Sequence, residues 1–140
     1  MIVTEAPAPA VRTGSVAADR AIRAGGLLVA LPATVVTAVA EFYLTPLRVV
    51  GVLIGVAIPF AAAANWGLAW FAVTTTGRRW AIGPPWALWT VIMLFAAGVR
   101  TDEGDYLLGG NDRVALVMIL VGSLTFAFYA YRSILRRGKP

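Results

Sequence analysis

The sequence predicts an all-α membrane protein with four transmembrane helices, and three observations lead to that class. The 140-residue chain is 59% hydrophobic and 14% charged, whereas a soluble domain carries about 25% charged residues. Its mean hydropathy is +0.78, and a soluble chain this short could not bury so much apolar surface. Four apolar runs approach the roughly 20 residues that cross a bilayer core, and none alternates as barrel strands do.

The four predicted spans cover residues of about 24–44, 49–73, 80–99 and 114–131. The connection around Pro46 is tight, and the segment TTTGRR that follows the second span is also short. Short connections place consecutive helices beside each other in opposite directions. We therefore expect an up-down antiparallel bundle.

The bundle forms one domain, residues 21–132, with a tail at each end. Residues 1–20 are rich in Ala and Pro and show no periodicity, which predicts a disordered cytoplasmic tail. Residues 133–140 are basic and are expected to lie against anionic lipid headgroups.

The basic residues predict that both chain ends are cytoplasmic. With the N-terminus inside, nine of the twelve bases lie on the inner side, and three lie outside: Arg48, Arg100 and Arg113. Short loops rich in Lys and Arg stay on the cytoplasmic side. The nine inner bases are Arg12, Arg20, Arg23, Arg78, Arg79, Arg132, Arg136, Arg137 and Lys139.

One alternative shortens the bundle. The sequence Ala38-Val39-Ala40 resembles a signal-peptidase site after an apolar stretch, and cleavage there would leave three spans in the same orientation. The 23-residue leader before that stretch contains acids and prolines, which favours an uncleaved first helix.

Composition excludes several kinds of chemistry. The chain has no Cys and no His, which removes thiol chemistry, disulfides, haem ligation and the common zinc sites. We expect no catalytic residue, cofactor or metal. The net charge of +5 is explained by orientation and lipid headgroups, without a nucleic-acid partner. The many Ala, Val, Gly and Arg residues, beside a single Lys, indicate a GC-rich bacterial genome.

Four of the seven acids lie in the segment between the third and fourth spans: Asp102, Glu103, Asp105 and Asp112. On the outer side no basic bias is needed, so their charge follows from the sorting rule. They do not fit the calcium-loop pattern, although a loose divalent-cation site stays an alternative. A role as a catalytic carboxylate pair is discounted, because an exposed loop offers no pocket that would separate their pKa values.

Glu41 is the one acid inside a predicted span, and an ionisable residue there is a functional candidate by default. A chain with four spans, this length and a Glu in the first helix resembles the small multidrug-resistance transporters, in which that Glu is essential. Glu41 lies near the outer end of its helix, however, and Arg48 follows across the turn. We interpret Glu41 as an interfacial acid that pairs with Arg48, with proton coupling as the alternative.

Asn65 lies near the middle of the second span, where an amide needs a partner on a neighbouring helix. The interpretation is an interhelical hydrogen bond, with a ligand contact as the alternative. Hydroxyl partners are available on the other helices: Thr34, Thr37, Thr90, Ser123 and Thr125.

Small residues and prolines mark further positions within the spans. Gly51 and Gly55 form a G-x-x-x-G motif, which predicts close helix packing within the chain or, alternatively, self-association. Pro32 and Pro59 are expected to kink their helices, and transporters use such broken helices to build sites.

With the spans placed, residues 20–135 resemble a family of small four-span integral membrane proteins from actinobacteria whose function is unknown. The matching residues are Asn65-Trp66, Gly77-Arg78-Arg79-Trp80, Arg100-Thr101 and Gly104-Asp105. The resemblance implies an inner-membrane location and four helices, and it implies no activity.

The function expected from the sequence is that of a non-enzymatic accessory or scaffold subunit. It would lie in the lipid bilayer and act through helix packing against another membrane protein or a second copy of itself. The runner-up is a small transporter or channel component, with Glu41 and Asn65 near a polar path. A membrane enzyme ranks third, because only the outer acids could serve it.

Overall fold

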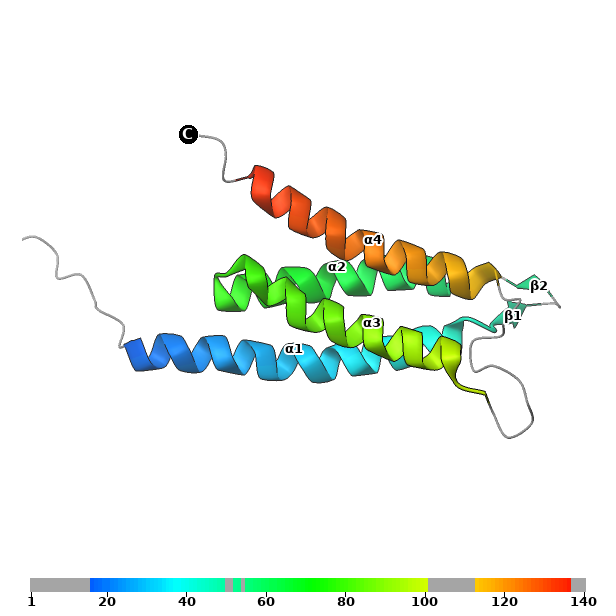
Figure 1. Ribbon diagram of the computed structural model, residues 1–140, viewed down its shortest axis with the longest axis horizontal. Coiled ribbons are helices and arrows are strands. Elements are labelled where there is room, and N and C mark those ends of the chain that lie inside the picture. The colour runs from blue at the N-terminus through cyan, green and yellow to red at the C-terminus, as the bar shows by residue number, and fades with distance from the viewer. Residues whose placement is uncertain (1–15, 50–51, 54, 101–112, 137–140) are drawn as a thin grey trace, which may run out of the picture.

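The computed structural model describes residues 16–49, 52–53, 55–100 and 113–136. Its main elements are four helices (Figure 1), which are α1 (Val16–Leu44), α2 (Ala57–Thr76), α3 (Gly83–Gly98) and α4 (Arg113–Leu135). A short 3-10 helix, η1 (Arg79–Ile82), leads directly into α3. Two antiparallel two-residue strands, β1 (Arg48–Val49) and β2 (Val52–Leu53), lie between α1 and α2.

Four helical segments are long and apolar enough to cross a membrane. They are Val16–Leu44, Ala57–Thr76, Arg79–Gly98 and Arg113–Leu135. In each of them, most of the apolar surface faces outward, since at most 33% of the most apolar window is buried inside the bundle. A soluble helix would bury its apolar face instead. Within the described residues, the prediction of four helices long and apolar enough to span a membrane is confirmed.

Helix α2 occupies the central position in the packing. Its most extensive contacts are with α1 and α4, and α3 packs mainly against α1. Helices α3 and α4 contact each other little, and in Figure 1 the C-terminal half of α4 diverges from the other three helices. Grooves lie on both sides of α4, one lined with residues of α2 and the other with residues of η1 and the start of α3.

Helices α1 and α2 approach each other closely at Gly26. A side chain there would collide with Oγ1 and Cβ of Thr75, the latter 2.6 Å from an ideal Cβ position. Small residues at helix contacts allow this approach in membranes. The close contact between α1 and α2 is therefore at Gly26. The sequence predicted such a contact at Gly51 and Gly55 instead.

The second span begins later than predicted. Helix α2 starts at Ala57, eight residues after the expected start at Val49, because the β-branched run before it pairs as β1 and β2. Gly55 has φ +62°, which excludes it from a helix, and Gly51 lies outside the described residues. The prediction of a helical G-x-x-x-G contact is therefore wrong.

The proline and tail predictions are also corrected in part. Pro59 is the third residue of α2, where its missing N–H has no intrahelical partner, so it does not interrupt the helix. Pro32 does lie inside α1. Helix α1 begins at Val16, so the last part of the predicted 1–20 tail is helical, and residues 1–15 lie outside the described residues. Helix α4 likewise extends to Leu135, into the predicted basic tail.

Candidate functional site: a buried polar cluster

All four helices contribute one residue each to a buried cluster, which we call the central polar cluster. It consists of Glu41 on α1, Asn65 on α2, Trp89 on α3 and Gly122 on α4. The side chains of Glu41, Asn65 and Trp89 are all 0% exposed, and Gly122 is buried as well.

The helix lengths explain why these residues meet. Asn65 and Gly122 lie eight and nine residues after the first residues of α2 and α4, and Trp89 lies nine residues before the end of α3. These ends of the helices lie together (Figure 1), so a rise of 1.5 Å per residue places all three about 12–14 Å from them. Glu41 starts nearer the end of α1, and helical side chains tilt toward the helix N-terminus, which carries its carboxyl group down to the others.

One hydrogen bond connects α1 to α3 inside this cluster. The indole Nε1–H of Trp89 donates to Oε2 of Glu41 over 2.9 Å. An indole nitrogen is only a donor and a carboxyl oxygen accepts, so the two groups are complementary. The Trp89 ring also packs against Phe126 of α4, with 6.2 Å between ring centroids.

Gly122 provides the space that the Trp89 ring occupies. An ideal Cβ at this position would lie 2.5 Å from both Cη2 and Cζ2 of Trp89, and 2.8 Å from Nδ2 of Asn65. Any larger residue would therefore displace the ring, the amide or α4 itself. Gly122 carries no polar group, but it determines whether the polar groups of the other three helices fit together.

Three polar atoms of the cluster have no hydrogen-bond partner among the described residues: Glu41 Oε1, Asn65 Nδ2 and Asn65 Oδ1. An unsatisfied buried polar group costs about 1–3 kcal/mol, and native structures contain few of them. The cluster thus has one unused carboxyl oxygen and a complete amide with which it could bind a proton, a water molecule or a small polar solute.

The interpretation of Glu41 as an interfacial acid is wrong, because the residue is fully buried. Its orientation follows from a stripe on α1 that faces the bundle. The buried residues of this helix are Gly26, Ala30, Thr34, Ala38 and Glu41, which recur at intervals of four and then three, as one helix face does. This stripe of small residues ending on an acid is the sequence signal that could have placed Glu41 inside. The side chain of Arg48, its expected partner, is not among those described.

The predicted hydrogen bond from Asn65 to a hydroxyl group is not formed either. The hydroxyls of Thr34, Thr37, Thr90 and Thr125 each donate to a carbonyl three or four residues earlier in their own helix, over 2.8–3.0 Å. This is the usual local bond of a threonine within a helix, so these four hydroxyl donors are used locally. Neither polar atom of the Asn65 amide has a partner among the described residues, Ser123 included.

Thr45 covers the cluster at the end of α1. Its Oγ1 donates to the Glu41 carbonyl over 2.8 Å, and the same hydroxyl lies 3.5 Å from Sδ of Met118 on α4. The chain therefore leaves α1 directly above the buried carboxyl. Sequence reasoning missed Thr45 and Gly122, because neither carries a recognisable motif.

The predicted outer acidic group lies outside the described residues: Asp102, Glu103, Asp105 and Asp112. Within the parts of the chain that the structure describes, no three metal-ligating side chains come together. The cation-site alternative therefore stays a prediction.

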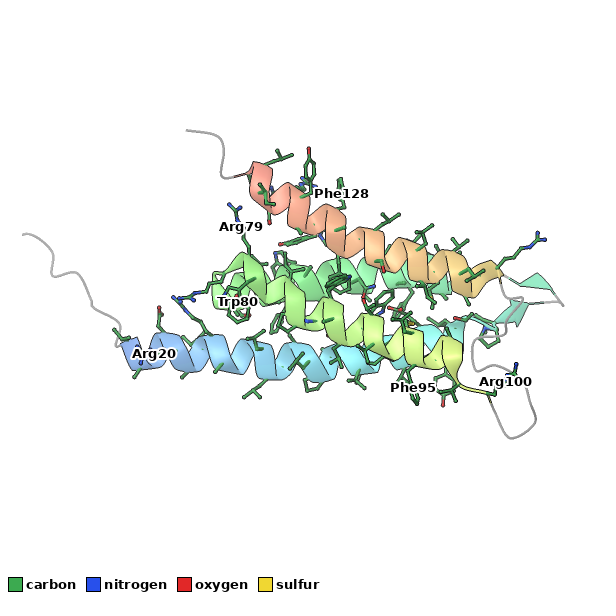
Figure 2. All side chains as sticks on the ribbon, in the orientation of Figure 1. Arg20, Arg79, Trp80, Phe95, Arg100 and Phe128 are labelled. Atoms are coloured by element: carbon green, nitrogen blue, oxygen red, sulfur yellow. The ribbon has the colours of Figure 1, made fainter. Side chains whose placement is uncertain are left out.

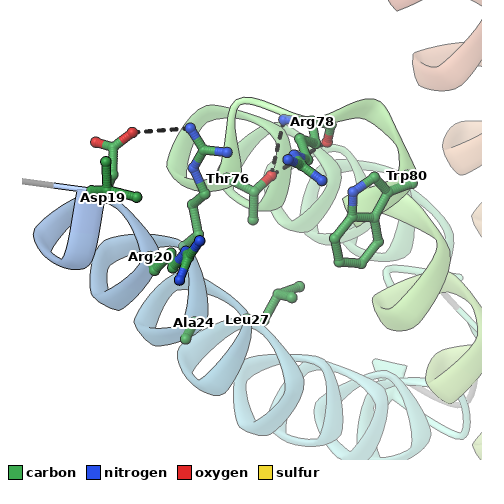
Figure 3. A pocket seen from close by; sticks show the side chains of 9 residues that line it. Asp19, Arg20, Ala24, Leu27, Thr76, Arg78 and Trp80 are labelled. Carbon is green, nitrogen blue, oxygen red and sulfur yellow. Dashed lines mark hydrogen bonds and ion pairs between the residues drawn. The ribbon is translucent and has the colours of Figure 1, made fainter.

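A second polar region lies at the opposite end of the bundle. A cavity of about 530 Å³ opens between α1 and the turn after α2, and its lining includes Arg20, Arg78 and Trp80 (Figure 3). Within it, Arg23 forms a salt bridge with Asp19 over 3.0 Å, and the Arg78 backbone N–H donates to Thr76 Oγ1 over 3.2 Å. The positive charge of this pocket is thus partly neutralised.

The fold and this site define a class, that of multi-pass membrane proteins with four helices around a buried polar cluster. In comparisons with known proteins, the chain matches no family model, no curated protein and no solved structure.

The central polar cluster predicts unequal effects of two tryptophan substitutions on the same helix. Trp89→Phe removes the donor to Glu41 and leaves both carboxyl oxygens without a partner, so we expect a loss of about 1–3 kcal/mol in the free energy of unfolding. Trp86, which is 46% exposed, provides the control, and Trp86→Phe should change stability by less than about 0.5 kcal/mol. Unfolding of the purified protein in mixed micelles, followed by circular dichroism, measures both. Equal stability of the two variants would contradict the role assigned to Trp89.

Proposed function

We propose that the protein is a non-enzymatic accessory subunit of a bacterial inner membrane, which acts by packing against a helix of a membrane partner. The observation that supports this most directly is a wide groove between α2 and α4, with a volume of about 1080 Å³. A groove of this kind on a membrane-spanning face is accessible to another transmembrane helix.

The residues of this groove suit a helix as the occupant. Ala62, Ala63 and Ala127 lie along it, and small residues let two helix backbones approach closely in lipid. Trp66 and Phe128 also line the groove, and their ring centroids are 6.1 Å apart. The groove therefore combines small residues with a fixed aromatic wall.

The proposal includes an up-down arrangement of the helices with both chain ends in the cytoplasm. It is supported by the chain direction in Figure 1, where successive helices run in opposite senses. It is also supported by charge, since six described arginines lie at one end: Arg20, Arg23, Arg78, Arg79, Arg132 and Arg136. Arg100, at the other end (Figure 2), and Arg113 are the bases at the ends of α3 and α4 that would face outward. Cytoplasmic sides of membrane proteins carry the larger share of Arg and Lys.

A second candidate function is that of a small transporter or channel component. It is favoured by the unpartnered Oε1 of Glu41 and the unpartnered amide of Asn65 in the bundle centre. Ionisable residues within the membrane commonly mark proton or ion pathways. Transport ranks second because the side chains of Glu41, Asn65 and Trp89 are 0% exposed. A solute could reach them only in an additional, open arrangement of the helices.

The accessory function predicts that filling the groove separates the protein from its partner. Ala63 is exposed on the groove and Ala97 is exposed on α3, away from it. We expect Ala63→Leu to abolish co-purification of a stoichiometric membrane partner in mild detergent, and Ala97→Leu to retain it. Quantitative mass spectrometry of the purified complexes measures the difference. A wild-type protein that purifies alone as a monomer at native expression, or a partner retained equally by both variants, would refute the proposal.

The second candidate predicts a loss of proton movement on Glu41→Gln. Glutamine keeps an acceptor for the Trp89 indole but cannot exchange a proton, so any proton flux that passes through this site should fall to the level of empty vesicles. Asp19→Asn removes an exposed acid of the same helix and should leave the flux unchanged. Proteoliposomes with an internal pH-sensitive dye and an imposed potential measure it. An accessory subunit without transport activity would show no flux in the wild type.

A further inference from the structure

We propose that the arginine-rich end of α4 binds one anionic phospholipid, with its phosphate against Arg79, Arg132 and Arg136 and one acyl chain between α3 and α4. This site adjoins the α2–α4 groove, with which its two cavities share Trp66, Leu124 and Ala127, and it is separate from the central polar cluster. Two adjoining cavities, one charged and one apolar, carry the proposal.

The charged cavity has a volume of about 460 Å³ and lies between the C-terminal ends of α2 and α4. Arg79, Arg132 and Arg136 line it together with Ser133, and its lining contains no acid. None of the three arginines forms a salt bridge with an acid in the described part of the chain. Arginine is the side chain best suited to hold a phosphate group.

One of these arginines is held in place by an aromatic ring. The guanidinium carbon of Arg132 lies 5.9 Å from the centre of the Trp66 ring, within the range of a cation–π contact. Trp66 is in turn packed edge-on against Tyr129, with centroids 4.9 Å apart and planes at 84°. An anion at this position would therefore meet a charge that is already oriented.

The apolar cavity has a volume of about 690 Å³ and lies in the groove that η1 and the first turn of α3 form with α4. Trp80, Trp86, Leu120 and Leu124 line it, and these side chains are 46–60% exposed. On α4 the lining extends from Leu120 to Ile134, about 21 Å of helix. One leaflet contributes roughly half of the 30 Å hydrocarbon core, so the groove is long enough for an acyl chain.

The two cavities meet, which is why a lipid fits better than a free anion. Arg79 and Ser133 line both of them, and Figure 2 shows Arg79 extending from the turn after α2 toward the C-terminal part of α4. Charge and apolar surface are thus joined in the order of a phospholipid's headgroup and chain. Basic pockets between transmembrane helices at the cytoplasmic side are known to suit anionic headgroups.

The other basic pocket at this end provides a comparison within the same chain. Its lining contains three arginines but also Asp19, which is paired with Arg23. One of its positive charges is therefore already satisfied. Arg23 and Arg79 are half-buried, and Arg20 and Arg136 are exposed. Substituting the pair Arg20 and Arg23 therefore provides a matched control for substituting Arg79 and Arg136.

Native mass spectrometry of the full chain in detergent tests the proposal, with phosphatidylglycerol and phosphatidylcholine of identical acyl chains as probes. We expect the wild type to retain one phosphatidylglycerol in preference to phosphatidylcholine. The double variant Arg79→Gln/Arg136→Gln should weaken this binding by about tenfold or more. Arg20→Gln/Arg23→Gln, which removes the same charge from the same end, should stay within about twofold of the wild type.

Two further measurements separate a lipid site from a simple anion site. Ala130→Phe places a ring in the α3–α4 groove, and it should reduce phosphatidylglycerol binding, whereas Ala97→Phe should not. Inorganic phosphate at equal concentration should fail to displace the lipid. The proposal is overturned if both lipids bind equally, if the two arginine double variants bind alike, or if inorganic phosphate displaces the lipid from the wild type.

Discussion

The interior of a lipid bilayer offers no hydrogen-bonding partner to a polar group, and the arrangement of this protein follows from that constraint. Every span is a helix, because a helix satisfies its own backbone. Threonine hydroxyls within the spans donate to carbonyls of their own helices. The described arginines lie at the helix ends, where their charges reach water and headgroups. Glu41, in the last turn of α1, is turned toward the bundle centre and meets the one indole N–H that is buried there.

The central polar cluster determines how the four helices pack against one another. Trp89 reaches from α3 to the carboxyl of α1, and it fits because Gly122 of α4 has no side chain. The cluster thereby fixes the relative positions of the helices. The shape of the two grooves beside α4 depends on those positions. A buried polar group can specify one arrangement of helices over others, as single polar residues do in coiled coils. In this account the buried polar groups determine the bundle, and the grooves beside α4 receive partners and lipid.

The sequence predicted the four spans because apolar length is a strong and local signal. It did not predict where α2 begins, since a run rich in Val, Ile and Gly fits a helix and a strand equally well before its partners are known. Glu41 was misplaced for a related reason: its short distance from the helix end predicts an interfacial acid, whereas the helix face on which it lies places it inside the bundle. The stripe from Gly26 to Ala38 contained that information. The fit of Gly122 to Trp89 depends on two helices far apart in the chain, and no local pattern records it.

The central claim of the proposal is that four helices cross the membrane, with both chain ends and the arginine-rich end of the bundle in the cytoplasm. Because the natural chain has no cysteine, single cysteines introduced at Leu47 and at Arg136 report on the two sides without background labelling. A membrane-impermeant maleimide applied to intact cells whose inner membrane is accessible should label Leu47→Cys directly and Arg136→Cys only after permeabilisation. Labelling of both positions from the same side, or of Arg136→Cys alone from outside, would contradict the account.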